Sequence, residues 1–156
     1  MSCERFCPLR TWTWRPPPSS RPLAITPGHL IRRSEQLHGV HWVNRVGSTL
    51  TPAQYGLLSA VAWHAPIDQS RAGDLASLDK SSTTDIIARL TRRGLVTSAP
   101  DEADRRRKLV VLTAHARAVL AEVTPAVALV QQDVTAPVSE PDAERLVQLL
   151  HLVAYR

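Results

Sequence analysis

The sequence is short of cysteine: among its 156 residues only Cys3 and Cys7 occur, both close to the N-terminus. A disulfide framework therefore cannot hold the chain together, and we expect a protein of the reducing cytoplasm. No run of about 18 apolar residues is present, which argues against a transmembrane helix. The N-terminal residues include Glu4 and Arg5 and lack the apolar segment that a secretion signal requires.

The motifs of common enzyme classes are also missing. The chain contains no G-x-S-x-G elbow, no phosphate-binding loop, no G-x-G-x-x-G fingerprint and no H-E-x-x-H. His38 and His41 are three residues apart, but two histidines without a third ligand are a weak indication of a metal site. We therefore expect no enzymatic activity, no cofactor and no bound metal.

Basic residues, in contrast, are in excess and concentrated in one segment. The chain has 19 Lys and Arg residues against 14 Asp and Glu, a net charge of +5. Residues 80–108 hold eight of these basic residues and only four acidic ones. Such a cluster is typical of proteins that bind a polyanion such as DNA.

Proline marks off the N-terminal part of the chain. Residues 1–24 include three consecutive prolines and show no helical or strand period, which predicts a flexible arm. Residues 25–156 are long enough, with 44% apolar residues in the chain, to form a single domain around one core. Residues 27–47 mix apolar and basic residues without an internal proline and predict a first helix.

A sharper helix start follows at Thr51. A capping hydroxyl there, Pro52 at the first helical position and Gln54 three residues after the cap form a capping box. Leu50 and Tyr55 are placed to form a hydrophobic staple around it. The second helix should continue from there and end before Pro66.

Two short helices joined by a tight turn are predicted next. Residues 67–78 read as a third helix with Ser70 as its cap, and Asp79 caps a fourth. Gly94 closes the fourth helix. Its apolar residues form an inward face, and its remaining residues stay polar, which is the helix-turn-helix arrangement. The inward residues are Ile86, Ile87 and Leu90.

The rest of the chain predicts a β-hairpin and two further helices. Residues 95–97 and 109–112 are strand-like and flank an arginine-rich segment, which describes a two-stranded wing able to reach a minor groove or the DNA backbone. Thr113 caps a long helix that Pro125 should kink or split. Ser139 opens a last helix, so strongly apolar that we expect it to bind a partner.

This order of elements, with LTPAQYGLL, DKSSTTDIIARLTRRGLV and DEADRRRKLVVLT, resembles the MarR family of bacterial winged helix-turn-helix transcription regulators over about residues 27–155. The resemblance implies a mainly α fold with a β-hairpin wing and a DNA-binding lobe at about 50–113. It also implies a homodimer whose terminal helices, about 27–47 and 114–156, form the dimerisation region. Two recognition helices would enter successive major grooves of a near-palindromic operator.

The same resemblance assigns DNA contacts to the fourth helix and the wing. Each of these residues could instead have a structural role that involves no DNA. The serines of the first turn could satisfy free backbone N–H groups, the aspartate and arginine of the helix could pair with each other, and the wing arginines could be a solvated tip. Arg92 and Arg93 suit the helix dipole instead. The predicted contacts are Ser81, Ser82, Thr83, Asp85, Arg89, Asp104, Arg105, Arg106 and Arg107.

Family members commonly release DNA when a small phenolic or aromatic acid enters a pocket beside the DNA-binding lobe. Arg32 with His38 is similar to the pattern of a subgroup that senses aromatic carboxylates. On physical grounds we expect the guanidinium to bind the carboxylate and the imidazole to bind a ring hydroxyl. Six residues of separation place the two on different sides of one helix. Alternatively the histidines are surface or interface groups and Trp42 is core. The candidates are Arg32, His38, His41, Trp42, Tyr55 and Trp63.

The sequence therefore predicts a sequence-specific DNA-binding regulator, a repressor that a small aromatic or phenolic acid releases from double-stranded DNA. The alternative is a sequence-indifferent DNA architectural protein without ligand control, which would use the same basic wing. Scrambling the operator separates the two, because only a specific regulator then loses affinity.

Overall fold

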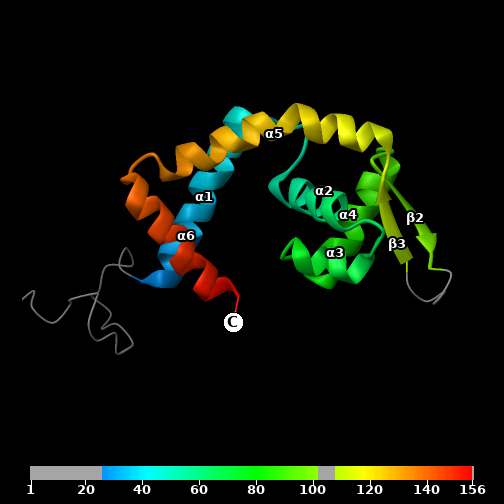
Figure 1. Ribbon diagram of the computed structural model, residues 1–156, viewed down its shortest axis with the longest axis horizontal. Coiled ribbons are helices and arrows are strands. Elements are labelled where there is room, and N and C mark those ends of the chain that lie inside the picture. Colours follow the sequence, from blue (N-terminus) through cyan, green and yellow to red (C-terminus); the bar gives the residue numbers. More distant parts are fainter. Residues whose placement is uncertain (1–25, 102–107, 156) are drawn as a thin grey trace, which may run out of the picture. The chain divides into compact units, whose positions relative to one another are not determined.

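The computed structural model describes residues 26–101 and 108–155, which are mainly helical (Figure 1). The described residues from Ser34 onward form one compact unit, and those up to Arg33 belong to a second. The predicted arm, with Cys3 and Cys7, lies outside the described residues. None of the helices described combines the length and the apolar character needed to cross a membrane.

Helix α1 spans Pro27–Arg45 and helix α2 spans Pro52–His64, close to the predicted bounds. The Thr51 hydroxyl accepts the Gln54 N–H at 3.2 Å, and Gln54 Oε1 accepts the Thr51 N–H at 3.1 Å. This reciprocal pair confirms the capping box. Helix α2 ends before Pro66, as predicted.

The next segment differs from the single helix expected over residues 67–78. Ile67–Asp68 forms a short strand, β1, and helix α3 covers only Gln69–Leu75. Its cap is the Asp68 carboxylate, which accepts the Arg71 N–H at 2.9 Å. The prediction of Ser70 as the cap is therefore wrong, because the backbone is still extended at Asp68 and the helix begins one residue later.

Strands β2 (Val96–Pro100) and β3 (Lys108–Leu112) form the predicted antiparallel hairpin. Strand β1 pairs with the other edge of β3, where Ile67 lies opposite Val110, so the strand order is β1-β3-β2. The hairpin is confirmed, and β1 adds a third strand that the sequence did not predict. Its extended backbone is stabilised by a partner strand distant in sequence, which local patterns do not show.

Helix α4 spans Lys80–Arg92, with Asp79 as its N-terminal cap. Gly94 follows it with φ of +65°, the left-handed conformation that glycine adopts most readily after a helix end. Both predicted helix boundaries are confirmed. The inward face is also as predicted: it consists of the buried Ile87 and Leu90 and the partly buried Ile86.

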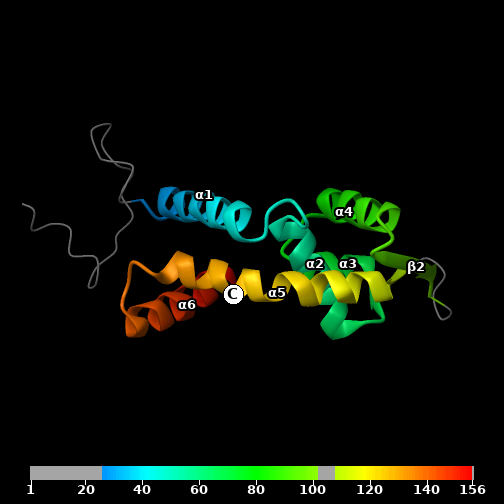
Figure 2. The ribbon, with the colours of Figure 1, turned by 90° about the horizontal axis from the view of Figure 1, so that it is seen from above.

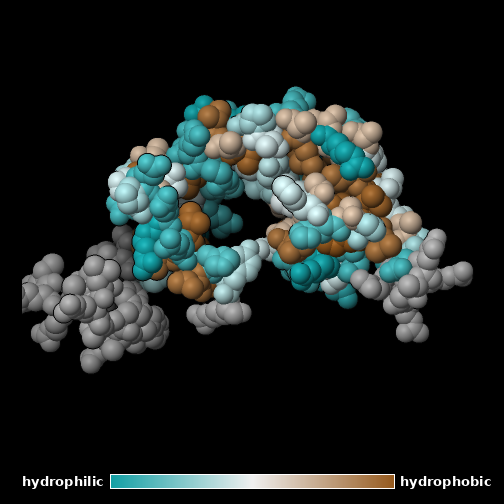
Figure 3. Space-filling view, viewed as in Figure 1, coloured by the Kyte–Doolittle hydropathy of each residue, from teal (hydrophilic) through white to brown (hydrophobic). Residues whose placement is uncertain are grey.

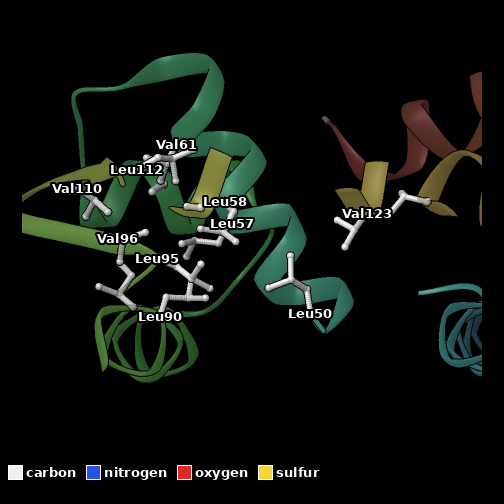
Figure 4. Close-up of a cluster of buried hydrophobic side chains, with 14 of the residues drawn as sticks. Leu50, Leu57, Leu58, Val61, Leu90, Leu95, Val96, Val110, Leu112 and Val123 are labelled. Atoms are coloured by element: carbon white, nitrogen blue, oxygen red, sulfur yellow. The ribbon is translucent and has the colours of Figure 1, made fainter. Parts of the chain in front are cut away.

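The core lies where α2, α4, the sheet and α5 meet (Figure 4). Its buried side chains come from every one of these elements and are aliphatic apart from Trp42 of α1, so that burying them removes a contiguous apolar surface from water. The largest fully buried side chains are Leu50, Leu57, Leu58, Leu90, Leu95, Val61, Val96, Val110 and Val130.

Helix α5 spans Ala114–Thr135 and is capped by the Thr113 hydroxyl, as predicted. Pro125 lies inside this helix and does not split it. Val123 and Val127, on either side of the proline, are both buried in the core. Packing on both sides holds the helix continuous although the proline removes one backbone hydrogen bond.

Helix α6 spans Glu140–Ala154, begins at the predicted cap Ser139, and has no buried residue. Its apolar side chains are exposed, Val147 for example by 61%, and apolar residues are visible at the surface over α6 in Figure 3. Helix α1 also exposes apolar side chains along its length. The exposed residues include Leu37, Val40 and Val43 in α1 and Leu146, Leu149, Leu150, Leu152 and Val153 in α6.

Helices α3 and α4 approach closely at Gly73, which is buried. A Cβ atom placed there would lie 2.8 Å from Thr83 Cγ2. Thr83 itself is only 3% exposed, and its hydroxyl donates to the Asp79 carbonyl at 2.8 Å. The prediction that Thr83 lies on the polar DNA-facing side is therefore wrong, because the missing side chain of Gly73 admits it between the two helices.

We predict that Gly73→Ala destabilises the fold by about 1 to 3 kcal/mol, the usual cost of forcing an extra methyl group into a packed interior. Urea unfolding followed by circular dichroism measures the change. The double variant Gly73→Ala, Thr83→Ala should recover much of the loss, because it removes the atoms that the new methyl group meets.

Gly56→Ala in α2 is the matched control. A Cβ at Gly56 meets only the Ala76 Cβ, at 3.9 Å, an ordinary contact distance. That variant should be neutral or more stable by up to about 1 kcal/mol, the helix propensity difference between glycine and alanine. Equal destabilisation of both variants would contradict the role given to Gly73.

Candidate nucleic-acid interface

One side of α4 is free of contacts with the rest of the core. Thr83, Ile87 and Leu90 are buried, whereas Ser81, Asp85, Arg89 and Arg92 are exposed. Figure 2 shows α4 at an edge of its unit, across α2 and α3 from α5. The outer side of α4 is thus polar, partly basic and accessible to a large partner.

The first turn of α4 is fixed by its cap. The Asp79 carboxylate accepts the Ser82 hydroxyl at 2.7 Å and the Ser82 N–H at 2.9 Å. These two bonds, the hydroxyl first, lower the pKa of the Asp79 carboxyl below its ordinary value. The Ser82 hydroxyl is therefore engaged in the helix start, while Ser81 is exposed and has no side-chain hydrogen bond to the described residues.

Arg89 of α4 is exposed without an ion pair to Asp85, whereas Arg93, directly after the helix, is bonded to the turn before α2. Asp85 and Arg89 are both exposed and do not pair with each other, so the alternative of an intrahelical ion pair is not seen. Arg93 instead donates to the Thr49 carbonyl at 2.8 Å and to Gln54 Oε1 at 3.4 Å. These bonds fit the structural role predicted for Arg93, although they tie it to the turn before α2 rather than only to the helix dipole.

The wing is described at its base only. Strands β2 and β3 bring Pro100 and Lys108 opposite each other, and Lys108 is exposed. The residues predicted to carry the wing contacts lie outside the described residues and stay a prediction. They are Asp104, Arg105, Arg106 and Arg107.

A polar contact between α3 and α4 was not anticipated from the sequence. Gln69 Nε2 donates to Thr84 Oγ1 at 3.0 Å. Thr84 is exposed, and Gln69 is half-buried as the first residue of α3. Because Ser70 was predicted to be the cap, Gln69 was not expected to be the first residue of the helix. The only sequence signal for Thr84 was its place among the hydroxyl residues of α4.

Three of the predicted ligand residues come together. His38 and Trp42 lie one turn apart on α1 with ring centroids 5.8 Å apart, and Trp42 meets Tyr55 of α2 edge-on at 5.7 Å. Trp42 is 4% exposed, and its Nε1 donates to the Leu50 carbonyl at 2.7 Å. Trp42 is thus a core residue, as the alternative supposed, and its ring packs against those of His38 and Tyr55.

The other ligand candidates lie apart from this cluster. His41 Nδ1 faces Asp133 Oδ2 of α5 at 3.7 Å, and Arg45 binds both oxygens of that carboxylate at 2.8 and 2.9 Å. The bonds from Arg45 lower the pKa of Asp133 and raise the pKa of Arg45. Trp63 is 84% exposed and has no ring contact with the cluster.

Arg32 is exposed on α1 and belongs to the other compact unit, so the structure does not place it against the His38 cluster. No group of three or more His, Cys, Asp or Glu side chains within residues 26–101 and 108–155 is arranged to hold a metal ion.

The sequence matches known proteins over most of its length. The sequence model of the MarR family matches residues 48–107. The transcriptional regulator HosA of Escherichia coli O157:H7 is 32% identical over 122 residues, which cover 78% of this chain and 90% of HosA.

Solved structures give the same result. The transcriptional regulator PcaV of Streptomyces coelicolor, in complex with its natural ligand, superposes with a TM-score of 0.83 at 32% identity, covering 87% of this chain and 96% of PcaV. BpsR of Bordetella bronchiseptica, whose DNA binding is regulated by 6-hydroxynicotinic acid, has a TM-score of 0.83 at 26% identity, with 87% and 98% covered. The chain therefore belongs to the MarR family and is a transcription regulator rather than an enzyme.

Proposed function

We propose that the protein is a repressor that binds a near-palindromic double-stranded operator as a homodimer and is released by a small aromatic or phenolic acid. The observation that carries the proposal is the outer side of α4, where Ser81, Asp85 and Arg89 are exposed and unpaired with one another while the inner side is buried. A helix that is anchored on one side and polar on the other suits the major groove.

The exposed apolar faces of α1 and α6 support the proposal of a homodimer. Contiguous apolar surface on a small protein is typical of an interface, and two copies bury the same faces against each other under two-fold symmetry. A symmetric dimer presents two copies of α4, and a symmetric pair of helices matches a near-palindromic site.

The effector proposal rests on the cluster of His38, Trp42 and Tyr55. A cluster of aromatic side chains suits a flat aromatic molecule, and an imidazole suits a ring hydroxyl. Arg32, on the preceding part of α1, is the cation proposed for the carboxylate. The control of BpsR by an aromatic acid supports this choice of ligand class.

The first prediction is that the purified protein shifts DNA taken from just upstream of its own coding region and not a scrambled version of it. A specific regulator separates the two by about 4 to 10 kcal/mol, whereas an architectural protein barely distinguishes them. One member of a panel of benzoate, hydroxybenzoate and hydroxycinnamate compounds should release the specific complex. Equal binding to both DNAs would favour the architectural alternative, and specific binding that every compound leaves intact would remove the effector from the proposal.

Arg89→Gln should weaken operator binding by removing a phosphate contact in each subunit. The slope of log K against log salt should fall by about 0.9 for each phosphate that the variant no longer neutralises, hence by about 1.8 for the dimer. Fluorescence anisotropy over a salt series measures the slope. Arg145→Gln in α6, which removes the same charge from an exposed arginine that, among the described residues, is bonded only to Gln148 of its own helix, is the matched control. Identical slopes for all three proteins would mean that Arg89 contacts no phosphate.

Arg32→Ala should abolish release by the effective acid while leaving the affinity of the unliganded protein for its operator unchanged. Loss of the guanidinium removes the partner of the carboxylate, and Arg32 takes no part in DNA binding under this proposal. Arg33→Ala, a neighbouring exposed arginine of α1, is the control and should respond normally. A gel shift titrated with the acid gives the result, and normal release from Arg32→Ala would clear Arg32 of this role.

A further inference from the structure

The contact between Gln69 and Thr84 fixes one side chain at the edge of the proposed DNA-reading surface. Gln69 Nε2 lies 3.0 Å from Thr84 Oγ1, and Thr84 Oγ1 lies 2.9 Å from the Lys80 carbonyl one turn earlier in α4. A threonine hydroxyl has a single proton, and here it is donated to the Lys80 carbonyl. The oxygen of Thr84 is therefore an acceptor toward Gln69.

In this arrangement the Gln69 amide turns its nitrogen toward Thr84. With the amide flipped, its carbonyl oxygen would face the Thr84 oxygen, and the Thr84 hydroxyl would have to leave the Lys80 carbonyl to bond it. The bond also leaves the amide with one N–H and its carbonyl oxygen available. A fixed amide with a donor and an acceptor to offer is the group that recognises adenine, through N7 and the N6 amino group, in the major groove.

Gln69 and Thr84 line a surface groove of about 450 Å³ between α3, α4 and the base of the wing. Lys80, at the start of α4, and Lys108, at the start of β3, line the same groove and are exposed. These two cations can contact a phosphate backbone at the border of the groove. Asp68 and the exposed Asp74 also line the groove, and the Asp68 carboxylate caps α3.

We propose that Gln69 is a specificity-determining residue that reads an adenine of the operator, and that Thr84 is the positioning residue that orients its amide. This inference rests on the proposed function, since it requires operator binding. It goes beyond that function by assigning base recognition to the first residue of α3 in addition to α4 and the wing.

The experiment compares the wild type with Gln69→Ala on operators in which each adenine in turn is replaced by 7-deazaadenine, which lacks only N7, or by another base. Fluorescence anisotropy gives the affinities. The wild type should lose about 5- to 150-fold when another base replaces one adenine in each half-site, the range expected for a bidentate contact. The loss with 7-deazaadenine should be smaller, because the N6 amino group remains. Gln69→Ala should bind the unmodified operator more weakly by a similar factor and be indifferent to changes at that one position.

Substitutions at Thr84 test the orientation. Thr84→Val keeps the shape of the side chain but removes the acceptor, so it should blunt discrimination at the same adenine. Thr84→Ser keeps the hydroxyl and should retain it. Gln131→Ala, an exposed glutamine of α5, is the control and should leave the discrimination map unchanged. Thermal unfolding of each variant shows that the fold is intact.

The outcomes separate this inference from the proposed function. If the wild type prefers its operator over scrambled DNA but the discrimination map of Gln69→Ala is unchanged, only the role of Gln69 is overturned. A uniform loss of affinity on every sequence would likewise overturn it, in favour of a phosphate contact. If the wild type does not distinguish operator from scrambled DNA, the proposed function fails and the inference fails with it.

Discussion

Two adjacent backbone carbonyls in the turn between α1 and α2 bind side chains from the ends of α1 and α4. The Leu50 carbonyl accepts the indole N–H of Trp42, which anchors α1, and the Thr49 carbonyl accepts the guanidinium of Arg93 at the end of α4. Arg93 also reaches Gln54, whose side chain completes the cap of α2. Losing one of these donors would leave a carbonyl without its partner, which is costly where the group is buried.

The packing of α4 on its inner side leaves its other side available. Gly73 lets α3 come close enough for Thr83 to be buried between the two helices, and the hydroxyl of Thr83 is satisfied by the Asp79 carbonyl. The helix is thereby anchored on its inner side. Its outer residues, such as Ser81 and Arg89, take no part in the core and remain free to contact a partner.

The helix boundaries were predicted correctly where the interaction that sets them is local. Thr51, Asp79, Thr113 and Ser139 each accept a backbone N–H from the third residue after them, so a window of four residues contains both partners. The cap at Asp68 is just as local, since its carboxylate accepts the Arg71 N–H, but Ser70 was chosen in its place. What the local pattern did not contain is the pairing of Ile67 with Val110, which makes residues 67–68 a strand. The assignment of Thr83 to the DNA-facing side failed for a similar reason.

The sequence by itself determined the order of the helices and hairpin and the polar character of α4, since these depend on periodicity and on contacts within a few residues. Its motifs identified the family by resemblance. The tertiary structure decided which polar residues of α4 are accessible and which distant groups meet. Gln69 and Thr84 are 15 residues apart in sequence, and Arg93 and Thr49 are 44 apart. Such contacts depend on how the helices cross. The crossing is set by side-chain volumes at positions such as Gly73, and no local sequence pattern contains that information.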